Sequence, residues 1–344
     1  MVKRCFSISL CCLLFLSLTS MPTSASFLDR SYRISGQTMG TFYNITIVAR
    51  KGFDARRCQK RIDAQLQMIN QSMSCFDKTS EISRFNRAAP RVGVKISGDF
   101  LAVMEKADRL YTLTNGAWDG TVKPLVDLWG FGTAGELKIV PDRETIQKTL
   151  ASTGFHHIDI SGRTLKKRTT PLSLDLGSIA KGYGVDKVAS LLKQSGITRF
   201  LVEIGGEIYA AGKNGKGAAW KVGISSPEKN GPAGELYKTV SLQDKAIATS
   251  GDYRNFITLG DKTWSHIIDP VTGFPVENRV VGASVITGDC TFADGLATAL
   301  MVMETDRGAA LVNSLDNCEA MIIVRDTKGQ FQSILSDGFA DYLE

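Results

Sequence analysis

The fold assignment starts from the stretch Asp175-Leu-Gly-Ser-Ile-Ala-Lys-Gly-Tyr-Gly-Val-Asp186. This stretch predicts a turn that leads into a helix over residues 178–194, which ends at Gly196. Apolar side chains recur at helical spacing on the inward face of that helix, at Val185, Val188 and Leu192. The segment that follows, Phe200 to Tyr209, predicts a strand, a Gly-Gly turn and a second strand.

The same two signals, helical spacing and short alternating strands, recur along the chain. Further helices are expected over residues 55–73, 99–114, 292–304 and 306–315. Further strands are expected over residues 41–48, 220–224, 237–242, 246–249, 256–259, 263–268 and 320–325. Because there is no strand–helix–strand rhythm and no GxGxxG or Walker loop, we expect an α+β fold with mixed or antiparallel sheets and flanking helices, not a Rossmann fold.

The composition is that of an ordinary globular protein, with 344 residues, 43% of them hydrophobic and 22% charged. The net charge is +6, and it falls to +4 if the segment that contains Lys3 and Arg4 is removed. The sequence has no long basic run. The charge therefore suits an anionic ligand and does not indicate nucleic-acid binding.

The N-terminus has the pattern of a secretory signal. Two basic residues precede a short apolar core, Leu10 to Leu18, and small residues follow it, with the simplest cleavage site after Ala25. We therefore expect residues 1–25 to be a signal peptide and residues 26–344 to form one exported, periplasmic domain, free or associated with the inner membrane. An uncleaved anchor is the alternative, although the apolar run is short for a membrane span.

Cysteine usage leaves the redox state open. Cys11 and Cys12 lie inside the apolar core, which is a poor position for lipidation. Export permits disulfides between the remaining cysteines, either as the pairs 58–75 and 290–318 or not at all, with buried free thiols as the alternative. The cysteines concerned are Cys58, Cys75, Cys290 and Cys318. None of them has zinc-site spacing.

Asp294 and Thr298 are four residues apart in a predicted helix, so the two side chains lie on one face, one turn apart. Carboxylate and hydroxyl oxygens are hard donors of the kind that Mg²⁺ prefers. The alternative is that Asp294 caps the helix and Thr298 only packs.

The turn before the predicted helix at 178–194 suits an anionic ligand. Gly177 lets the backbone approach a ligand closely, and the first helical turn offers free N–H groups. Lys181 is placed to reach a phosphate or ribose, and Asp175 to accept hydrogen bonds from ribose or flavin. The alternative is an ordinary helix start with a solvated lysine.

The segment from Gly116 to Gly132 is rich in glycine and aromatic residues. Trp118 or Phe131 can stack on a flat ring, and Asp119 can hold a polar edge of the same ligand. We interpret Trp129, in contrast, as a residue that fills the core.

Two further motifs carry polar groups. Thr249 and Ser250, with the glycine that follows, can form a nest of hydroxyl and amide groups for phosphate, to which Arg254 adds charge. A serine nucleophile is the rival interpretation, but the motif has no nucleophile elbow. His266 precedes an Asp-Pro turn and is a natural general base, whereas His156 and His157 are interpreted as structural.

In this order along the chain, the motifs resemble those of the ApbE family, the FAD:protein FMN transferases. The resemblance extends from about Gly36 to Val302. It rests on Met39-Gly-Thr41, Ser80-Glu-Ile-Ser-Arg-Phe-Asn86, Asp119-Gly-Thr-Val-Lys-Pro-Leu125, Asp175 to Asp186, Gly205-Gly206, Thr249-Ser-Gly251, His266-Ile-Ile-Asp-Pro270 and Ala293 to Thr298.

The resemblance implies Mg²⁺-dependent cleavage of the FAD diphosphate, in which FMN passes to a threonine hydroxyl of a target protein as a phosphoester and AMP is released. It implies acceptors among the exported domains of redox complexes, such as sodium-pumping NADH:quinone reductase. An FAD pyrophosphatase, which yields FMN and AMP, and a non-catalytic periplasmic flavin-binding protein are the alternatives.

The resemblance also assigns roles to residues. Mg²⁺ would use the side chains of Asp294 and Thr298 and backbone carbonyls near Ser178 and Ala297, and His266 would be the catalytic base. The residues implied in FAD contact are Met39, Phe76, Ala117, Trp118, Asp119, Asp175, Lys181 and Ile267, beside the phosphate nest of Thr249 and Ser250. The chain departs from other members at three of these positions. Ala297 is Asp in some, Lys181 is Glu in some, and Phe76 is often a different aromatic residue.

Overall fold

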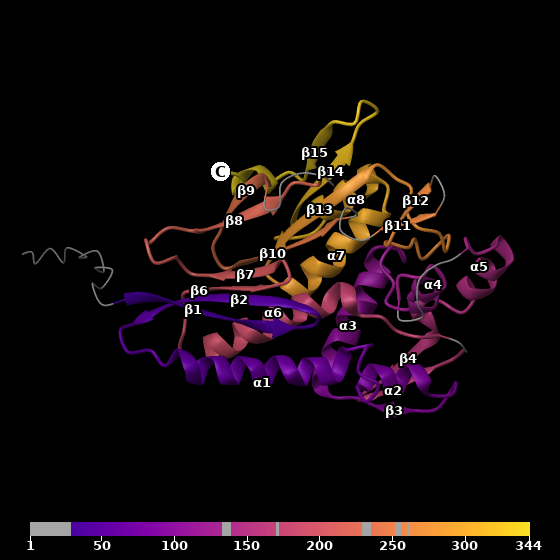
Figure 1. Cartoon of the computed structure of the whole chain (residues 1–344), viewed down its shortest axis with the longest axis horizontal. Coiled ribbons are helices and arrows are strands. Elements are labelled where there is room, and N and C mark those ends of the chain that lie inside the picture. The colour runs from indigo at the N-terminus through magenta and orange to yellow at the C-terminus, as the bar shows by residue number, and fades with distance from the viewer. Residues whose placement is uncertain (1–28, 133–138, 170–171, 229–234, 252–255, 260–261) are drawn as a thin grey trace, which may run out of the picture.

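The computed structural model describes residues 29–132, 139–169, 172–228, 235–251, 256–259 and 262–344. At its centre is an eight-stranded sheet in which all neighbouring strands are antiparallel (Figure 1). In spatial order the strands are β1 (Asp29–Thr38), β2 (Thr41–Arg50), β6 (Phe200–Ile204), β7 (Glu207–Ala211), β10 (Lys245–Gly251), β13 (Val280–Thr287), β14 (Glu319–Arg325) and β15 (Phe331–Leu335). This arrangement confirms the expected α+β fold.

Smaller elements surround the sheet. Three short sheets are formed by β3 (Val94–Lys95), β5 (Thr164–Lys167) and β4 (Ile158–Ser161), by β8 (Trp220–Ser225) and β9 (Leu236–Leu242), and by β11 (Phe256–Leu259) and β12 (Lys262–Ser265). The described helices are α1 (Ala55–Met73), α2 (Glu81–Arg87), α3 (Gly98–Leu113), α4 (Lys123–Leu128), α5 (Arg143–Leu150), α6 (Gly177–Gln194), α7 (Cys290–Val302) and α8 (Thr305–Asn313), with 3₁₀ turns at Phe155–His157 and Phe339–Tyr342.

Each face of the large sheet has its own apolar core. Helices α1, α3, α6 and α7 cover one face, where Ile45 of β2 packs in the same cluster as Leu66 of α1 and Leu300 of α7. On the other face, Val48 of β2 shares a second cluster with Trp220 of β8 and other residues of the β8–β9 hairpin and the C-terminal turn. Strand β2 contributes to both clusters because successive side chains of a strand point to opposite faces of the sheet.

Helices α6 and α7 touch at the backbone, and this contact positions the site. A Cβ atom at Gly182 would lie 2.4 Å from the carbonyl oxygen of Cys290. Asp186, one turn further along α6, accepts hydrogen bonds from the backbone N–H groups of Cys290 and Thr291, at 2.9 Å each. The Asp289 side chain caps α7 by accepting from the Phe292 N–H group at 2.8 Å. Two carboxylates from different elements therefore satisfy the free donors at the start of α7.

The expected helices are present within two residues of their predicted ends, and each expected strand is present. The sequence-based prediction missed three strands of the large sheet, β1, β13 and β15, and also the small β3–β5–β4 sheet and the short helices α2, α4 and α5. All eight residues of β13 are buried, so the strand has no apolar–polar alternation to detect. The predicted strand over residues 263–268 is too long, because β12 ends at Ser265 and the chain then turns.

All four cysteines in the described part of the chain are free thiols, which is the alternative to the two possible disulfides. Cys58 lies near the start of α1 and Cys75 just past its end, and a helix of that length separates them far beyond disulfide reach. The described helices include none that is both long and apolar enough to cross a membrane.

Candidate functional site

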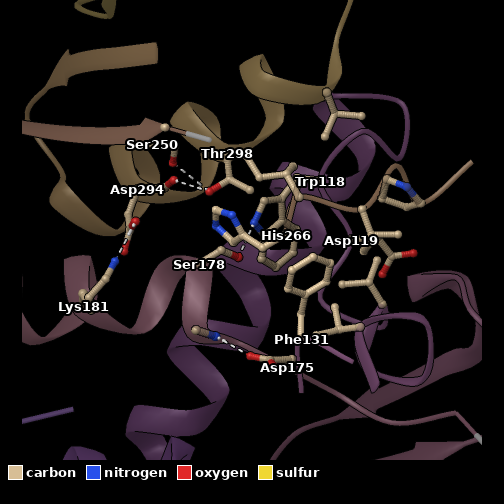
Figure 2. A pocket seen from close by; sticks show the side chains of 18 of the residues that line it. Trp118, Asp119, Phe131, Asp175, Ser178, Lys181, Ser250, His266, Asp294 and Thr298 are labelled. Atoms are coloured by element: carbon tan, nitrogen blue, oxygen red, sulfur yellow. Dashed lines mark hydrogen bonds and ion pairs between the residues drawn. The ribbon is translucent and has the colours of Figure 1, made fainter. Parts of the chain in front are cut away.

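A cleft of about 890 Å³ opens beside the N-terminal end of α6. Its wall is formed by the first turn of α6, one face of α7, the end of β10, and the segments around Trp118 and His266 (Figure 2). The predicted site residues that line it are Ala117, Trp118, Asp119, Asp175, Ser178, Lys181, Thr249, Ser250, His266, Ile267, Asp294 and Thr298. Segments more than 150 residues apart in the sequence therefore converge on one cleft.

Asp294 and Thr298 lie on the face of α7 that meets the cleft. The Asp294 carboxylate is buried and accepts a hydrogen bond from the Gly182 N–H group at 3.0 Å. The Thr298 hydroxyl lies 3.0 Å from the Ser250 hydroxyl, which brings the end of β10 into the same oxygen-rich corner. Asp294 is not the helix cap, because Asp289 occupies that position, so the capping alternative is wrong.

Lys181 lies between two buried carboxylates. Its ammonium nitrogen is 2.9 Å from Glu207 Oε1 and 3.4 Å from Asp294 Oδ1. Burial, together with the nearby Asp294 carboxylate, raises the pKa of Glu207 to about 8. Burial alone would lower the pKa of Lys181, but the two carboxylates raise it above its ordinary value. The lysine is therefore a firmly held cation, and the interpretation of Lys181 as a solvated side chain is wrong.

Glu207 is the site residue that the sequence analysis missed. It opens β7 directly after the Gly205-Gly206 turn, and only 3% of it is exposed. Its Oε2 atom is buried without a hydrogen-bond partner among the described residues. The available signal was a charged residue at the start of an otherwise apolar strand, because glutamate is almost never fully buried unless it is paired.

The corner formed by Asp294, Thr298, Ser178 and Ser250 fits a hard divalent cation. All four present oxygen donors to the cleft, and Glu207 adds a buried carboxylate oxygen that lacks a partner. No group of three His, Cys, Asp or Glu side chains with metal-site geometry occurs in the described residues. A cation held here would depend on hydroxyl groups, waters and ligand phosphates, which is the usual coordination of Mg²⁺.

Aromatic side chains lie on the opposite side of the cleft (Figure 2). The Trp118 indole N–H donates to the Ser178 hydroxyl at 3.0 Å, which ties this loop to α6. Trp118 is only 1% exposed, so it presents little of its ring face, and half-buried Phe131 offers more stacking surface. Trp129 is fully buried, and its N–H donates to the Gly273 carbonyl, which confirms its place in the core.

Two acidic residues line the same side. Asp119 is buried and accepts hydrogen bonds from the backbone N–H and the hydroxyl of Thr121, at 2.8 and 2.7 Å. Burial raises the pKa of Asp119 to about 6. Asp175 accepts from the Gly177 N–H group at 2.8 Å, and its own N–H donates to the Gly120 carbonyl, so it links the turn before α6 to the Asp119 segment.

His266 lies just after β12 and faces the cleft, with its ring centre 6.3 Å from that of Phe131. The rings of His156 and His157 contact each other at a centroid distance of 4.0 Å, tilted by 45°, and His156 is hydrogen-bonded to the Tyr111 hydroxyl. Neither of these two lines the cleft. Thr249 pairs with the Ser284 hydroxyl at 2.8 Å.

Three predicted site residues do not line the cleft, and Arg254 lies outside the described residues. Met39 has a left-handed backbone conformation (φ 49°), and its methyl group lies in the core beside Gly184. Phe76 is 84% exposed. Ala297 is fully buried within the core. Their roles toward FAD and metal stay predictions.

Comparison with known proteins gives consistent matches over nearly the full chain. The sequence profile of the ApbE family matches residues 39–322. A Vibrio cholerae protein named FAD:protein FMN transferase is 42% identical over 311 residues, covering 90% of this chain and 92% of its own length. A Klebsiella pneumoniae protein of the same name is 33% identical over 336 residues, with 96% and 95% coverage.

Solved structures agree with these matches. The flavin transferase ApbE from Vibrio cholerae superposes with a TM-score of 0.84 at 41% identity, covering 92% of this chain and 100% of that one. The Pseudomonas stutzeri flavinyl transferase ApbE gives a TM-score of 0.82 at 33% identity, with 92% and 98% coverage. The chain therefore belongs to the ApbE family and is a transferase.

Proposed function

We propose that the protein transfers FMN from FAD to a threonine hydroxyl of a target protein, that AMP is the other product, and that the reaction requires Mg²⁺. The relatives named FAD:protein FMN transferase support the reaction class. The observation that carries the proposal is the cleft itself. It combines an oxygen-rich cation corner at Asp294 and Thr298, an aromatic wall at Phe131, and a histidine.

Different groups of residues in the cleft would contact different parts of FAD. The aromatic wall and Asp119 suit the flavin ring, whose faces are apolar and whose edge is polar. The N-terminal end of α6 lines the cleft and would direct its positive dipole end toward the diphosphate. Asp294 and Thr298, with Ser178 nearby, would hold Mg²⁺. When bound, Mg²⁺ neutralises charge on phosphate oxygens in the transition state.

His266 is the proposed general base. It takes the proton from the incoming threonine Oγ as that oxygen attacks the phosphorus atom of the FMN half. A new P–O bond forms to threonine, the bond from that phosphorus to the bridging oxygen breaks, and AMP leaves with the bridging oxygen. A positioned general base accelerates a reaction by roughly 10²–10⁴-fold. Binding and orientation of the two substrates must therefore supply much of the remaining rate acceleration.

We also propose the setting of the reaction. The N-terminal sequence supports export, so acceptors would be exported domains of redox complexes, such as sodium-pumping NADH:quinone reductase. Residues 1–25 would be removed on export, and the periplasm would be the site of action.

The test is to incubate residues 26–344 with FAD, Mg²⁺ and a flavinylatable acceptor domain, then weigh the acceptor by intact-mass spectrometry while AMP is assayed. The expected result is a mass gain equal to one FMN residue with an equal amount of AMP. An acceptor with its threonine replaced by valine is the control and should gain no mass. AMP and free FMN without a mass gain on a competent acceptor would instead identify an FAD pyrophosphatase.

A further inference from the structure

The positive charge of this chain is concentrated at one end of the fold. Residues 29–63 contain eight lysines and arginines but only three aspartates, a net charge of +5, while the whole chain carries +6. All eight cations are exposed, and the six that lie where β1 begins, where β2 ends and in the first two turns of α1 form what we call the basic pole. They are Arg30, Arg50, Lys51, Arg56, Arg57 and Lys60. Among the described residues, none of the six forms an ion pair with an acidic side chain.

The basic pole is one rigid corner. The start of β1 pairs with the end of β2, so Arg30 lies opposite Ala49 and next to Arg50. The Tyr32 hydroxyl donates to the Arg50 carbonyl, and the Tyr32 ring packs edge-on against Phe53 at 5.2 Å. The turn through Phe53 leads directly into α1, whose first two turns carry the remaining cations. Figure 1 shows this corner at the left, where β1, β2 and α1 meet.

The position of the cations is unfavourable for the fold. Arg56, Arg57 and Lys60 lie in the first two turns of α1, where the helix dipole already concentrates positive charge. The first turn contains no acidic residue, and the capping carboxylate of Asp54 is the nearest compensation. Since folding does not explain this placement, a bound anionic partner is the better physical reason for it.

The pole also lies away from the cleft. Helix α6 begins with residues that line the cleft, and its C-cap residue is Ser195, whose hydroxyl accepts a hydrogen bond from Arg61 of α1 at 2.9 Å. An 18-residue helix is about 27 Å long. Arg61 is explained by this contact at the negative end of the α6 dipole, so we exclude it from the pole. None of the six cations of the basic pole lines the cleft, so they do not contact a substrate bound there.

We propose that the basic pole binds the anionic phospholipid headgroups of a membrane surface, and that the bound enzyme thereby holds its cleft away from the lipid. Two observations favour a membrane surface as the partner of the basic pole. The cations are spread over two strands, a turn and a helix, which suits a sheet of phosphates better than one small ligand. The chain that precedes Asp29 enters the domain at this pole, and its apolar run, Leu10 to Leu18, would bring the same corner to the membrane during export. The proposal does not depend on the proposed reaction.

The test uses residues 26–344, which contain every described element, and measures co-sedimentation with vesicles. Phosphatidylcholine vesicles that contain about 30 mol% phosphatidylglycerol as the anionic lipid are compared with pure phosphatidylcholine vesicles, each at low and at high salt. We expect binding only to the anionic vesicles, and loss of that binding at high salt. The triple variant Arg56→Gln, Arg57→Gln, Lys60→Gln should bind on the order of a hundredfold more weakly, since each cation near an anionic surface contributes roughly fivefold.

The matched control removes three exposed cations elsewhere, with Lys95→Gln, Arg143→Gln and Lys328→Gln, and should bind like the wild type. Thermal unfolding adds a second readout. The pole variant should melt at the same or a higher temperature than the wild type, because it relieves repulsion at the start of α1. Equal vesicle binding by wild type and pole variant, or no preference for anionic vesicles, would overturn the proposal. Binding of DNA or of an acidic protein in place of vesicles, abolished in the same variant, would also overturn it.

Discussion

Three charged side chains meet at the base of the cleft, with Lys181 between Glu207 and Asp294. Without the lysine, two buried carboxylates would face each other with no cation. The lysine therefore serves as the counter-ion of the apo site, and a divalent cation would offset the same negative charge. If a divalent cation binds here, the stability of the site should depend on both Lys181 and the metal.

We predict that Lys181→Met lowers the free energy of unfolding by about 3 kcal/mol in the absence of metal, because a buried ion pair loses one partner. Mg²⁺ should restore part of this loss, so the metal-induced rise in Tm should be larger in the variant than in the wild type. Adding Glu207→Gln to Lys181→Met should recover stability without metal. If Lys181→Met were as stable as the wild type in the presence of a chelator, the Lys181 ammonium would not be needed to neutralise the buried carboxylates.

The His266→Ala variant separates binding from chemistry. We expect FAD affinity to change little, because the aromatic wall and the α6 N-terminus remain, while transfer falls by roughly 10²–10⁴-fold. Flavin fluorescence titration would measure the affinity, and intact mass of the acceptor would measure the transfer. Turnover equal to that of the wild type would remove His266 from the mechanism.

Asp119 should give the fold a specific pH dependence. Its pKa is about 6 in the folded state, raised by burial from 3.8. Between these values the folded state retains a proton that the unfolded state has released, so the stability contribution of Asp119 decreases as pH rises from about 4 to about 6 and is constant above that. The difference in unfolding free energy between wild type and Asp119→Asn should therefore change by on the order of 2 kcal/mol across this range. Denaturant unfolding at several pH values measures it, and parallel pH profiles would show that the Asp119 carboxyl is not perturbed.

At the scale of elements, the α6–α7 contact aligns the cleft. The two helices approach at Gly182, and this approach lets the Gly182 N–H group hold Asp294. Sequence patterns predict where each of the two helices lies in the chain, but they do not show that α6 packs against α7.

Gly182→Ala should therefore disrupt the site. The new Cβ would meet backbone atoms of Cys290 and Thr291 at 2.4 to 2.8 Å, and backbone cannot yield as a side chain can. We expect a loss of about 3 kcal/mol in stability together with weaker Mg²⁺ binding. Gly184→Ala, two residues along the same helix, is the matched control. There the Cβ would meet the flexible methyl of Met39 at 3.0 Å, so the loss should be smaller. Equal losses for both variants would mean that the close helix crossing is not the cause.

At the scale of the whole molecule, the fold does not depend on metal. The two apolar cores on either side of the sheet consist of buried aliphatic and aromatic side chains, whose packing needs no metal ligand. We predict that removal of Mg²⁺ by chelation abolishes transfer but leaves the far-UV circular dichroism spectrum unchanged, with Tm lowered by only the binding contribution of the metal. Loss of secondary structure on chelation would contradict this and indicate a structural metal.

Elements with local sequence signals could be predicted without a structure. The spacing of apolar residues placed α1, α3 and α6, and turn chemistry at Gly205-Gly206 placed the β6–β7 hairpin. The motifs also indicated most of the residues that line the cleft, because glycine, hydroxyl and carboxylate groups recur there in a characteristic order. These signals need only neighbours within a few residues, so they are visible without a structure.

The tertiary structure alone decided what depends on contacts between distant segments. The ion pair of Lys181 with Asp294 spans 113 residues of sequence, and no local pattern predicts it. The strand β13 was invisible because burial on both faces removes alternation. The resemblance implied that Met39 and Phe76 contact FAD, but neither lines the cleft, because the course of the backbone, and not residue type alone, decides where a side chain lies.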